Sequence, residues 1–152
     1  MTGGSHGGYL TGWLIGHPKY KHLFKVAAAR NAVLDMNYMN SSTDIPDWIS
    51  ACVFNKPLDQ TQLTTDDVKT IHERSPISVV HNVTTPIMLM VGEVDLRVPH
   101  HQSYKYIHCL KERGVECRLL KYPGESHPLE AKFETSADCS INMSLWFDKY
   151  LN

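Results

Sequence analysis

The sequence lacks an excess of charge of either sign. Its 152 residues carry 15 Lys and Arg against 16 Asp and Glu, which gives a formal net charge of −1 at pH 7. No basic run interrupts this balance. Proteins that bind nucleic acids or anionic membrane surfaces use clustered positive charge. The balance therefore argues against both kinds of partner.

Long apolar runs are also missing, because the longest apolar stretches have only the length of a strand. A membrane-spanning helix needs about 20 predominantly apolar residues, so we expect no span. The first residues are rich in glycine rather than basic and then apolar, so no secretory signal peptide is visible. We therefore expect a cytosolic protein.

Cysteine is scarce, and the spacing of the cysteines gives no sign of cross-links. The sequence has four cysteines without any C-x-x-C pair: Cys52, Cys109, Cys117 and Cys139. This pattern favours reduced, partly buried thiols over a disulfide framework or a zinc site. The nine histidines include no H-E-x-x-H motif, so we expect no bound metal ion.

Glycine is concentrated at the start of the chain. Residues 3–8 read Gly-Gly-Ser-His-Gly-Gly, a G-x-S-x-G pattern with extra glycines. This pattern typically places a serine on a tight strand-to-helix turn, with its hydroxyl clear of the backbone. Ser5 is therefore a candidate nucleophile, and the backbone N–H of His6 is the expected oxyanion donor. Glycine-serine clusters also occur in plain loops, so the assignment depends on partners elsewhere.

Those partners follow in the expected chain order. A serine nucleophile needs a histidine base, and the histidine needs an acid that orients it. Residues 86–91 are a short apolar run typical of a buried parallel strand, and Asp95 lies in the loop beyond it. Residues 117–122 read as another strand, and His127 lies in the turn-forming loop that follows. The sequence therefore predicts a catalytic triad of Ser5, Asp95 and His127.

The remaining chain predicts an α/β fold. We expect a strand over residues 23–30, helices over residues 7–17, 65–73, 101–113 and 137–151, and a pocket-shaping loop with one or two short helices over residues 31–63. Gly8, Gly12 and Gly16 recur on one face of the first helix. This stripe indicates a helix backbone that lies close against a sheet.

Three further residues are candidates for substrate binding. Arg30 and Arg97 flank strand ends, where a guanidinium can meet a substrate carboxylate or carbonyl, although loop bracing explains an arginine there equally well. Trp48 either lines a binding site or anchors the surrounding insertion. Both interpretations stay open for all three residues.

Several stretches together resemble the prolyl oligopeptidase family of serine peptidases, and within it the acylaminoacyl peptidases. The similarity extends over nearly the whole chain. The stretches that carry it are GGSHGG at 3–8, STDIPDW at 42–48, RSPI at 74–77, TP at 85–86, GEVDLRVP at 92–99 and YPGESH at 122–127.

The resemblance implies that residues 1–152 are one partial catalytic domain, the C-terminal part of an α/β-hydrolase fold. It implies that Ser5 is the nucleophile, Asp95 the orienting acid and His127 the general base. The implied reaction removes an N-acylated amino acid from the blocked end of short peptides through an acyl-enzyme, without a metal or organic cofactor.

The resemblance implies a β-propeller beside the catalytic domain in members of that branch, and we expect it to be absent from this chain. We also expect the first half of the hydrolase sheet, the loop with the second oxyanion donor and the strand leading into Ser5 to be missing. A nucleophile without that strand would be held loosely. The alternatives are another peptidase or an esterase of the family, or an inactive fragment that only associates with intact subunits. A homo-oligomer is compatible with these alternatives.

Overall fold

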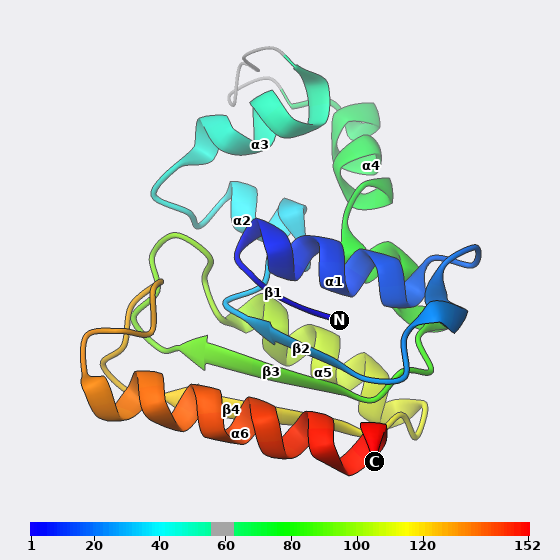
Figure 1. Ribbon diagram of the computed structural model, residues 1–152. Coiled ribbons are helices and arrows are strands. Elements are labelled where there is room, and N and C mark those ends of the chain that lie inside the picture. Colours follow the sequence, from blue (N-terminus) through cyan, green and yellow to red (C-terminus); the bar gives the residue numbers. More distant parts are fainter. Residues whose placement is uncertain (56–62) are drawn as a thin grey trace.

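The computed structural model describes residues 1–55 and 63–152, so part of the expected loop over residues 31–63 lies outside the described residues. A parallel sheet with the strand order β1-β2-β3-β4 forms the centre (Figure 1). Its strands are β1 (Thr2–Gly4), β2 (Ala27–Arg30), β3 (Ile87–Gly92) and β4 (Cys117–Tyr122). The helices are α1 (His6–Gly16), α2 (Met36–Asn40), α3 (Pro46–Phe54), α4 (Thr65–Glu73), α5 (His101–Glu112) and α6 (Phe133–Leu151), with 3-10 turns η1 (Lys21–Leu23) and η3 (Pro76–Asn82).

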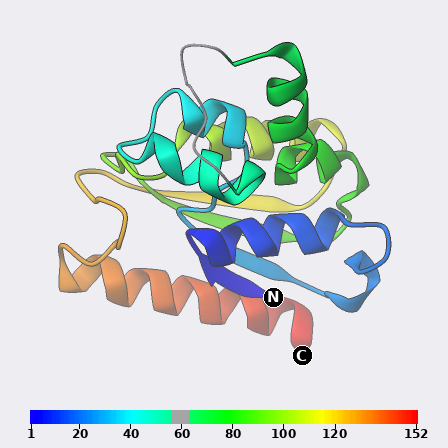
Figure 2. The same ribbon diagram turned by 90° about the horizontal axis from the view of Figure 1, so that it is seen from above.

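Each face of the sheet carries its own apolar layer, because alternate side chains of a strand point to opposite faces. Ala27 and Leu89 pack in the layer that α1, η3 and α5 cover. Ala28 and Met88 pack in the layer that α6 covers. Figure 2 shows α6 lying along one side of the sheet, apart from the other helices. The fold is thus the expected α/β arrangement of a parallel sheet with flanking helices.

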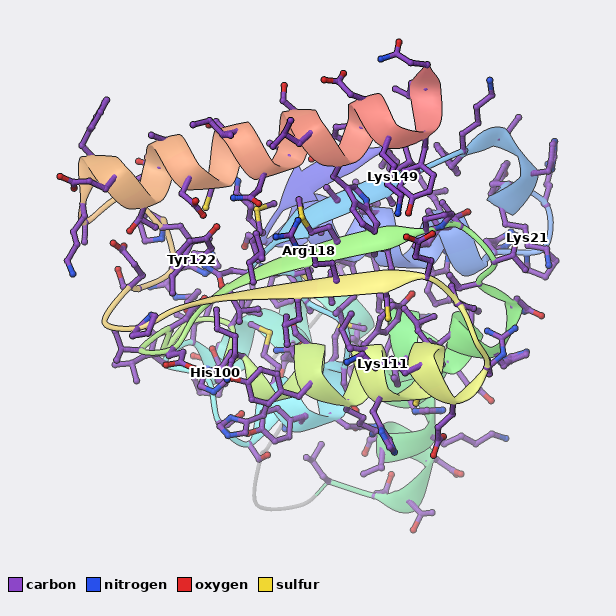
Figure 3. All side chains as sticks on the ribbon, turned by 90° about the horizontal axis from the view of Figure 1, so that it is seen from below. Lys21, His100, Lys111, Arg118, Tyr122 and Lys149 are labelled. Carbon is purple, nitrogen blue, oxygen red and sulfur yellow. The ribbon has the colours of Figure 1, made fainter. Side chains whose placement is uncertain are left out.

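Contacts with strand β4 and the residue before it hold α6 at both ends (Figure 3). The Tyr122 hydroxyl, at the carboxyl end of β4, donates a 2.7 Å hydrogen bond to Asp138 Oδ2 near the start of the helix. Lys149, in the last turn of α6, pairs with Glu116 just before β4. The loop that carries His127 therefore connects a strand and a helix that are bonded to each other.

The expectation that no strand leads into Ser5 is wrong. β1 pairs in parallel with β2, with Thr2 opposite Ala28 and Gly4 opposite Arg30. The segment Thr-Gly-Gly has a low intrinsic preference for strands, and its extended form comes from the hydrogen bonds that β2 supplies. Ser5 therefore follows a paired strand.

Two predicted boundaries are also wrong. The strand expected from residue 23 begins at Ala27, because the sheet ladder begins where Ala27 donates its N–H to the carbonyl of Pro86 (2.9 Å). The last helix begins at Phe133, four residues before the predicted start. Phe133 is 84% exposed, so the first turn lies outside the apolar stripe that α6 packs against the sheet around Met143 and Trp146.

The glycine stripe of α1 marks a close approach, but its partners are not the sheet strands that the sequence predicted. A Cβ at Gly8 would lie 2.5 Å from Cβ of Ala32, and one at Gly16 would lie 2.7 Å from the carbonyl oxygen of Val79. The neighbours are the segment after β2 and the turn η3. Among the residues described, no helix is long and apolar enough to cross a membrane.

Candidate active site

Ser5 occupies the turn between β1 and α1 in a strained conformation. Its backbone angles are φ 54° and ψ −119°, and a positive φ costs a residue other than glycine about 1–3 kcal/mol. The turn is held by a 2.9 Å hydrogen bond from the Ser5 N–H to the carbonyl of Arg30. The hydroxyl makes no capping hydrogen bond to α1, although serine often caps helices. It remains available for chemistry.

Gly3 makes this turn possible. A Cβ at Gly3 would lie 2.4 Å from the carbonyl carbon and oxygen of Gly7, which are backbone atoms that cannot swing aside. The first turn of α1 therefore folds directly over β1. This close approach is the physical reason for a glycine two positions before the serine.

The carboxylate of Asp95 is enclosed and fully hydrogen-bonded. Its side chain is 0% exposed. Oδ1 accepts the N–H groups of Arg97 and Val98, each at 2.9 Å, and Oδ2 lies 2.8 Å from Nδ1 of His127. A carboxylate bonded in this way holds the imidazole with its proton on Nδ1 and leaves Nε2 free to accept a proton.

Ser5 and His127 face the same cavity, a space of about 220 Å³ that His6, Trp48 and Arg97 also line. Ser5, Asp95 and His127 follow β1, β3 and β4. Because parallel strands end at the same edge of a sheet, the three residues meet at that edge. The structure thus gathers the predicted triad.

The backbone N–H of His6 is suitably placed to stabilise an oxyanion. His6 is the first residue of α1, and the N–H groups of a helix's first turn lack partners within the helix and carry its positive partial charge. His6 is exposed, and its imidazole stacks on Tyr9 with 5.4 Å between ring centroids and meets the edge of Trp48 at 6.1 Å.

Trp48 lines the cavity beside Ser5 and also packs against the core of the insertion. It lines the Ser5 cavity and, with His6, a neighbouring space of about 150 Å³. It also packs against the core of the insertion around Ile49 and Val53. Pro46 at the first position of α3 sets the start of the helix that carries it.

Arg97 lines the cavity and also braces a loop. It lines the Ser5 cavity, while Nε and Nη2 pair with the two carboxylate oxygens of Asp44 at 2.6 and 3.1 Å. The hydroxyl of Thr43 donates to the carbonyl of Arg97 at 2.7 Å. The hydrogen bond from Arg97 lowers the pKa of the Asp44 carboxyl and raises the pKa of the guanidinium.

Arg30 is not brought to the cavity. It does not belong to the described residues that line the Ser5 space. Its strand neighbour Ala28 packs toward α6, and alternation puts Arg30 on that same face. Burial raises the pKa of the Cys139 thiol on α6, and a hydrogen bond with Tyr122 and then the charge of Arg30 oppose the rise.

Sequence reasoning missed Asn31 and Asp44. The side chain of Asn31 contacts the backbone of both catalytic loops. The only sequence signal was a polar residue directly after an apolar strand, at the edge where α/β proteins bind ligands. In the part of the chain that the structure describes, no group of three or more His, Cys, Asp or Glu residues could hold a metal ion.

A strained serine on a strand-to-helix turn and a histidine bonded to an enclosed carboxylate, at one edge of a parallel sheet, define a serine hydrolase of the α/β type. The model of the prolyl oligopeptidase family matches residues 1–152. The chain therefore belongs to this family of serine peptidases.

Relatives within the family cover the chain almost completely. The acylamino-acid-releasing enzyme of Arabidopsis thaliana is 43% identical over 99% of this chain and 19% of its own length. The acylamino-acid-releasing enzyme of Homo sapiens is 38% identical over 99% of this chain and 20% of its own length. The chain spans about a fifth of the length of these relatives.

Solved structures share the fold. The acylaminoacyl peptidase of Pyrococcus horikoshii superimposes with a TM-score of 0.80 at 23% identity, covering 99% of this chain and 23% of that one. A puromycin-hydrolyzing peptidase of Mycobacterium tuberculosis superimposes with a TM-score of 0.73 at 23% identity, covering 98% of this chain and 21% of that one. The expectation of a partial α/β-hydrolase fold is confirmed.

Proposed function

We propose that this chain is the catalytic segment of a serine peptidase that releases an N-acylated amino acid from the blocked N-terminus of short peptides. The observation that carries the proposal is the 2.8 Å bond between Asp95 and His127 beside a strained Ser5 in one cavity. The relatives named acylamino-acid-releasing enzymes support the choice of substrate.

The chemistry follows from the roles that these positions allow. Nε2 of His127 takes the proton of the Ser5 hydroxyl while Oγ attacks the scissile carbonyl carbon, and Asp95 stabilises the resulting imidazolium. The N–H of His6 binds the oxyanion. The imidazolium then protonates the leaving amine, so the peptide bond breaks and an ester to Ser5 remains. Water, deprotonated by His127, attacks the ester and releases the N-acylated amino acid.

The surroundings of Ser5 suit a short, uncharged acyl end. Apolar side chains of Val33, Met39 and Ile45 line the cavity together with Trp48. Nε and Nη2 of Arg97 each use one N–H on Asp44, so Nη1 and the second N–H of Nη2 can donate to a substrate carbonyl. A neighbouring space of about 360 Å³, lined in part by His127 and Arg97, offers room for further residues of the peptide.

A reducing, cytosolic setting stays a prediction of the sequence. The four cysteines are free in the structure. We likewise propose that residues 1–152 form one partial catalytic domain.

A second candidate is a catalytically inactive segment that associates with intact subunits. The position of β1 at an edge of the sheet favours it, because an edge strand presents unpaired N–H and carbonyl groups to another chain. Exposed apolar side chains on α6, Ile141 at 58% and Leu145 at 62%, add to that surface.

Labelling of the purified chain with a fluorophosphonate probe tests the proposal. We expect wild type and Ser140→Ala to be labelled, because Ser140 is an exposed serine on α6, and Ser5→Ala to be unlabelled. Hydrolysis of an acetyl-alanine anilide should fall by about 10⁴-fold or more in Ser5→Ala. The same assay with unacetylated alanine anilide and with a simple ester separates acylpeptide release from other peptidase or esterase activity. A folded wild-type chain without labelling would eliminate the enzyme and leave the associating segment.

A further inference from the structure

The end of strand β2 connects the nucleophile to the acid and the base. We propose that Asn31 is a positioning residue that fixes the loops of Asp95 and His127 relative to each other and to the Ser5 turn. This inference rests on the proposed function, because it assigns Asn31 to the geometry of that same triad.

Asn31 is buried, and its backbone is in the left-handed region. It is 2% exposed, its φ is 40°, and its N–H donates to the carbonyl of Met90 at 2.8 Å. Asparagine enters the left-handed region more readily than most residues. The chain thus turns sharply at the end of β2 while remaining bonded to β3.

The side-chain amide of Asn31 binds the end of β3, which leads into the Asp95 loop, and the loop that carries His127. Oδ1 of Asn31 accepts the N–H of Gly92 at 2.9 Å. Nδ2 donates to the carbonyl of His127 at 2.7 Å and lies 3.4 Å from the carbonyl of Ser126. The acceptor fixes the last residue of β3, from which the Asp95 loop departs. The donor fixes the backbone of the base itself.

The two loops also touch each other where Asn31 binds them. A Cβ at Gly92 would lie 2.4 Å from the carbonyl oxygen of Glu125 and 2.7 Å from that of Ser126. The N–H of Val94 donates to the carbonyl of Glu125 at 3.1 Å. These contacts set the distance between the loops, while Asn31 sets the place of the pair relative to β2.

The Ser5 turn is held by the neighbouring residue. The carbonyl of Arg30 accepts the N–H of Ser5 at 2.9 Å. The dipeptide Arg30-Asn31 therefore contacts the nucleophile through its main chain and the base through its side chain. A displacement of the Asn31 amide changes the distance from His127 to Ser5, which a catalytic proton transfer tolerates poorly.

Two substitutions of Asn31 separate the role of its side-chain amide from the role of its backbone conformation. Asn31→Asp keeps the shape and the acceptor for Gly92 but removes both N–H donors. Asn31→Gly accommodates the positive φ and removes the whole amide. Asn142→Ala is the matched control, because Asn142 Nδ2 donates to a main-chain carbonyl, that of Asp138, at 2.9 Å on the exposed face of α6.

The readout is the low-field proton NMR signal of the hydrogen-bonded Nδ1–H of His127, measured together with kcat and KM for the acetyl-alanine anilide. We expect both Asn31 variants to lose or shift the signal, and their kcat to fall by about 10²-fold while KM stays within about twofold. Asn142→Ala should match wild type in both measurements. If Asn31→Asp does not fold, Asn31→Gly decides the result.

Unchanged signal and kcat in a folded Asn31→Gly would overturn the assignment. A wild-type chain that shows the signal but has no turnover would contradict the proposed function alone. Loss of that signal in the Asn31 variants would still support the positioning role, so the two failures are distinguishable.

Discussion

The nucleophile and the acid–base pair are held by unequal means. Ser5 follows β1, a three-residue strand at the edge of the sheet. Asp95 follows β3, a six-residue strand buried along its whole length with a neighbour on each side. Two backbone N–H groups and His127 bind the Asp95 carboxylate.

This difference shows where the site is vulnerable. A strained backbone persists only where its surroundings over-determine it. The acid–base pair has redundant contacts, whereas the strain of Ser5 depends on a short strand and on close packing at Gly3. We infer that damage to β1 reduces the catalytic rate more than equal damage near β3.

The largest effect is expected for Asp95→Asn, which disables the acid–base pair without touching β1. The amide oxygen can still accept the N–H groups of Arg97 and Val98, so the amide NH₂ would face Nδ1 of His127 and favour the wrong tautomer. We expect kcat to fall by about 10⁴-fold. Steady-state kinetics and thermal unfolding measure this effect, with Asp148→Asn on the exposed face of α6 as control. A loss below tenfold would show that Asp95 does not orient the base.

The comparison between the two regions is sharpest at Gly3 and Gly92, where an added Cβ would meet backbone atoms at 2.4 Å in each case. Gly3→Ala should displace the Ser5 turn and reduce kcat about 10²-fold, because a misplacement of about 1 Å has that effect. Gly92→Ala should lower the free energy of unfolding by about 1–3 kcal/mol, as at other overpacked sites, and should reduce kcat less than Gly3→Ala, because redundant contacts hold the acid–base pair. Kinetics and urea unfolding of both variants measure the difference.

Gly7→Ala is the control for this pair, because a Cβ placed there would meet no atom within 4 Å beyond its chain neighbours and the backbone of its own helix. If Gly92→Ala reduced kcat more than Gly3→Ala, the inferred order of vulnerability would be reversed.

The smallest effect concerns the pair of Asp44 and Arg97. The hydrogen bond from Arg97 lowers the pKa of Asp44 below its ordinary value of 3.8. The pair therefore stabilises the folded state above that value, and this contribution disappears as the pH falls through the folded-state pKa. Asp44→Asn should reduce the loss of stability between about pH 6 and pH 2. Both groups are exposed, so added salt should weaken the difference. Equal pH profiles for wild type and variant would contradict it.

The order of the predicted triad and the alternation of strands and helices could be predicted from the sequence alone. The apolar run before Asp95, the glycines around Ser5 and the turn residues before His127 are local signals. Each reports the backbone that its own segment must adopt, so each was visible without knowledge of its neighbours.

Which distant groups meet depends on how the elements pack in three dimensions. Thr2–Gly4 becomes a strand because β2 pairs with it, and Arg30 faces α6 because of its register in the sheet. The amide of Asn31 finds partners 61 and 96 residues away in sequence. Side-chain hydrogen bonds of such range depend on how strand ends are placed side by side, which no local pattern encodes.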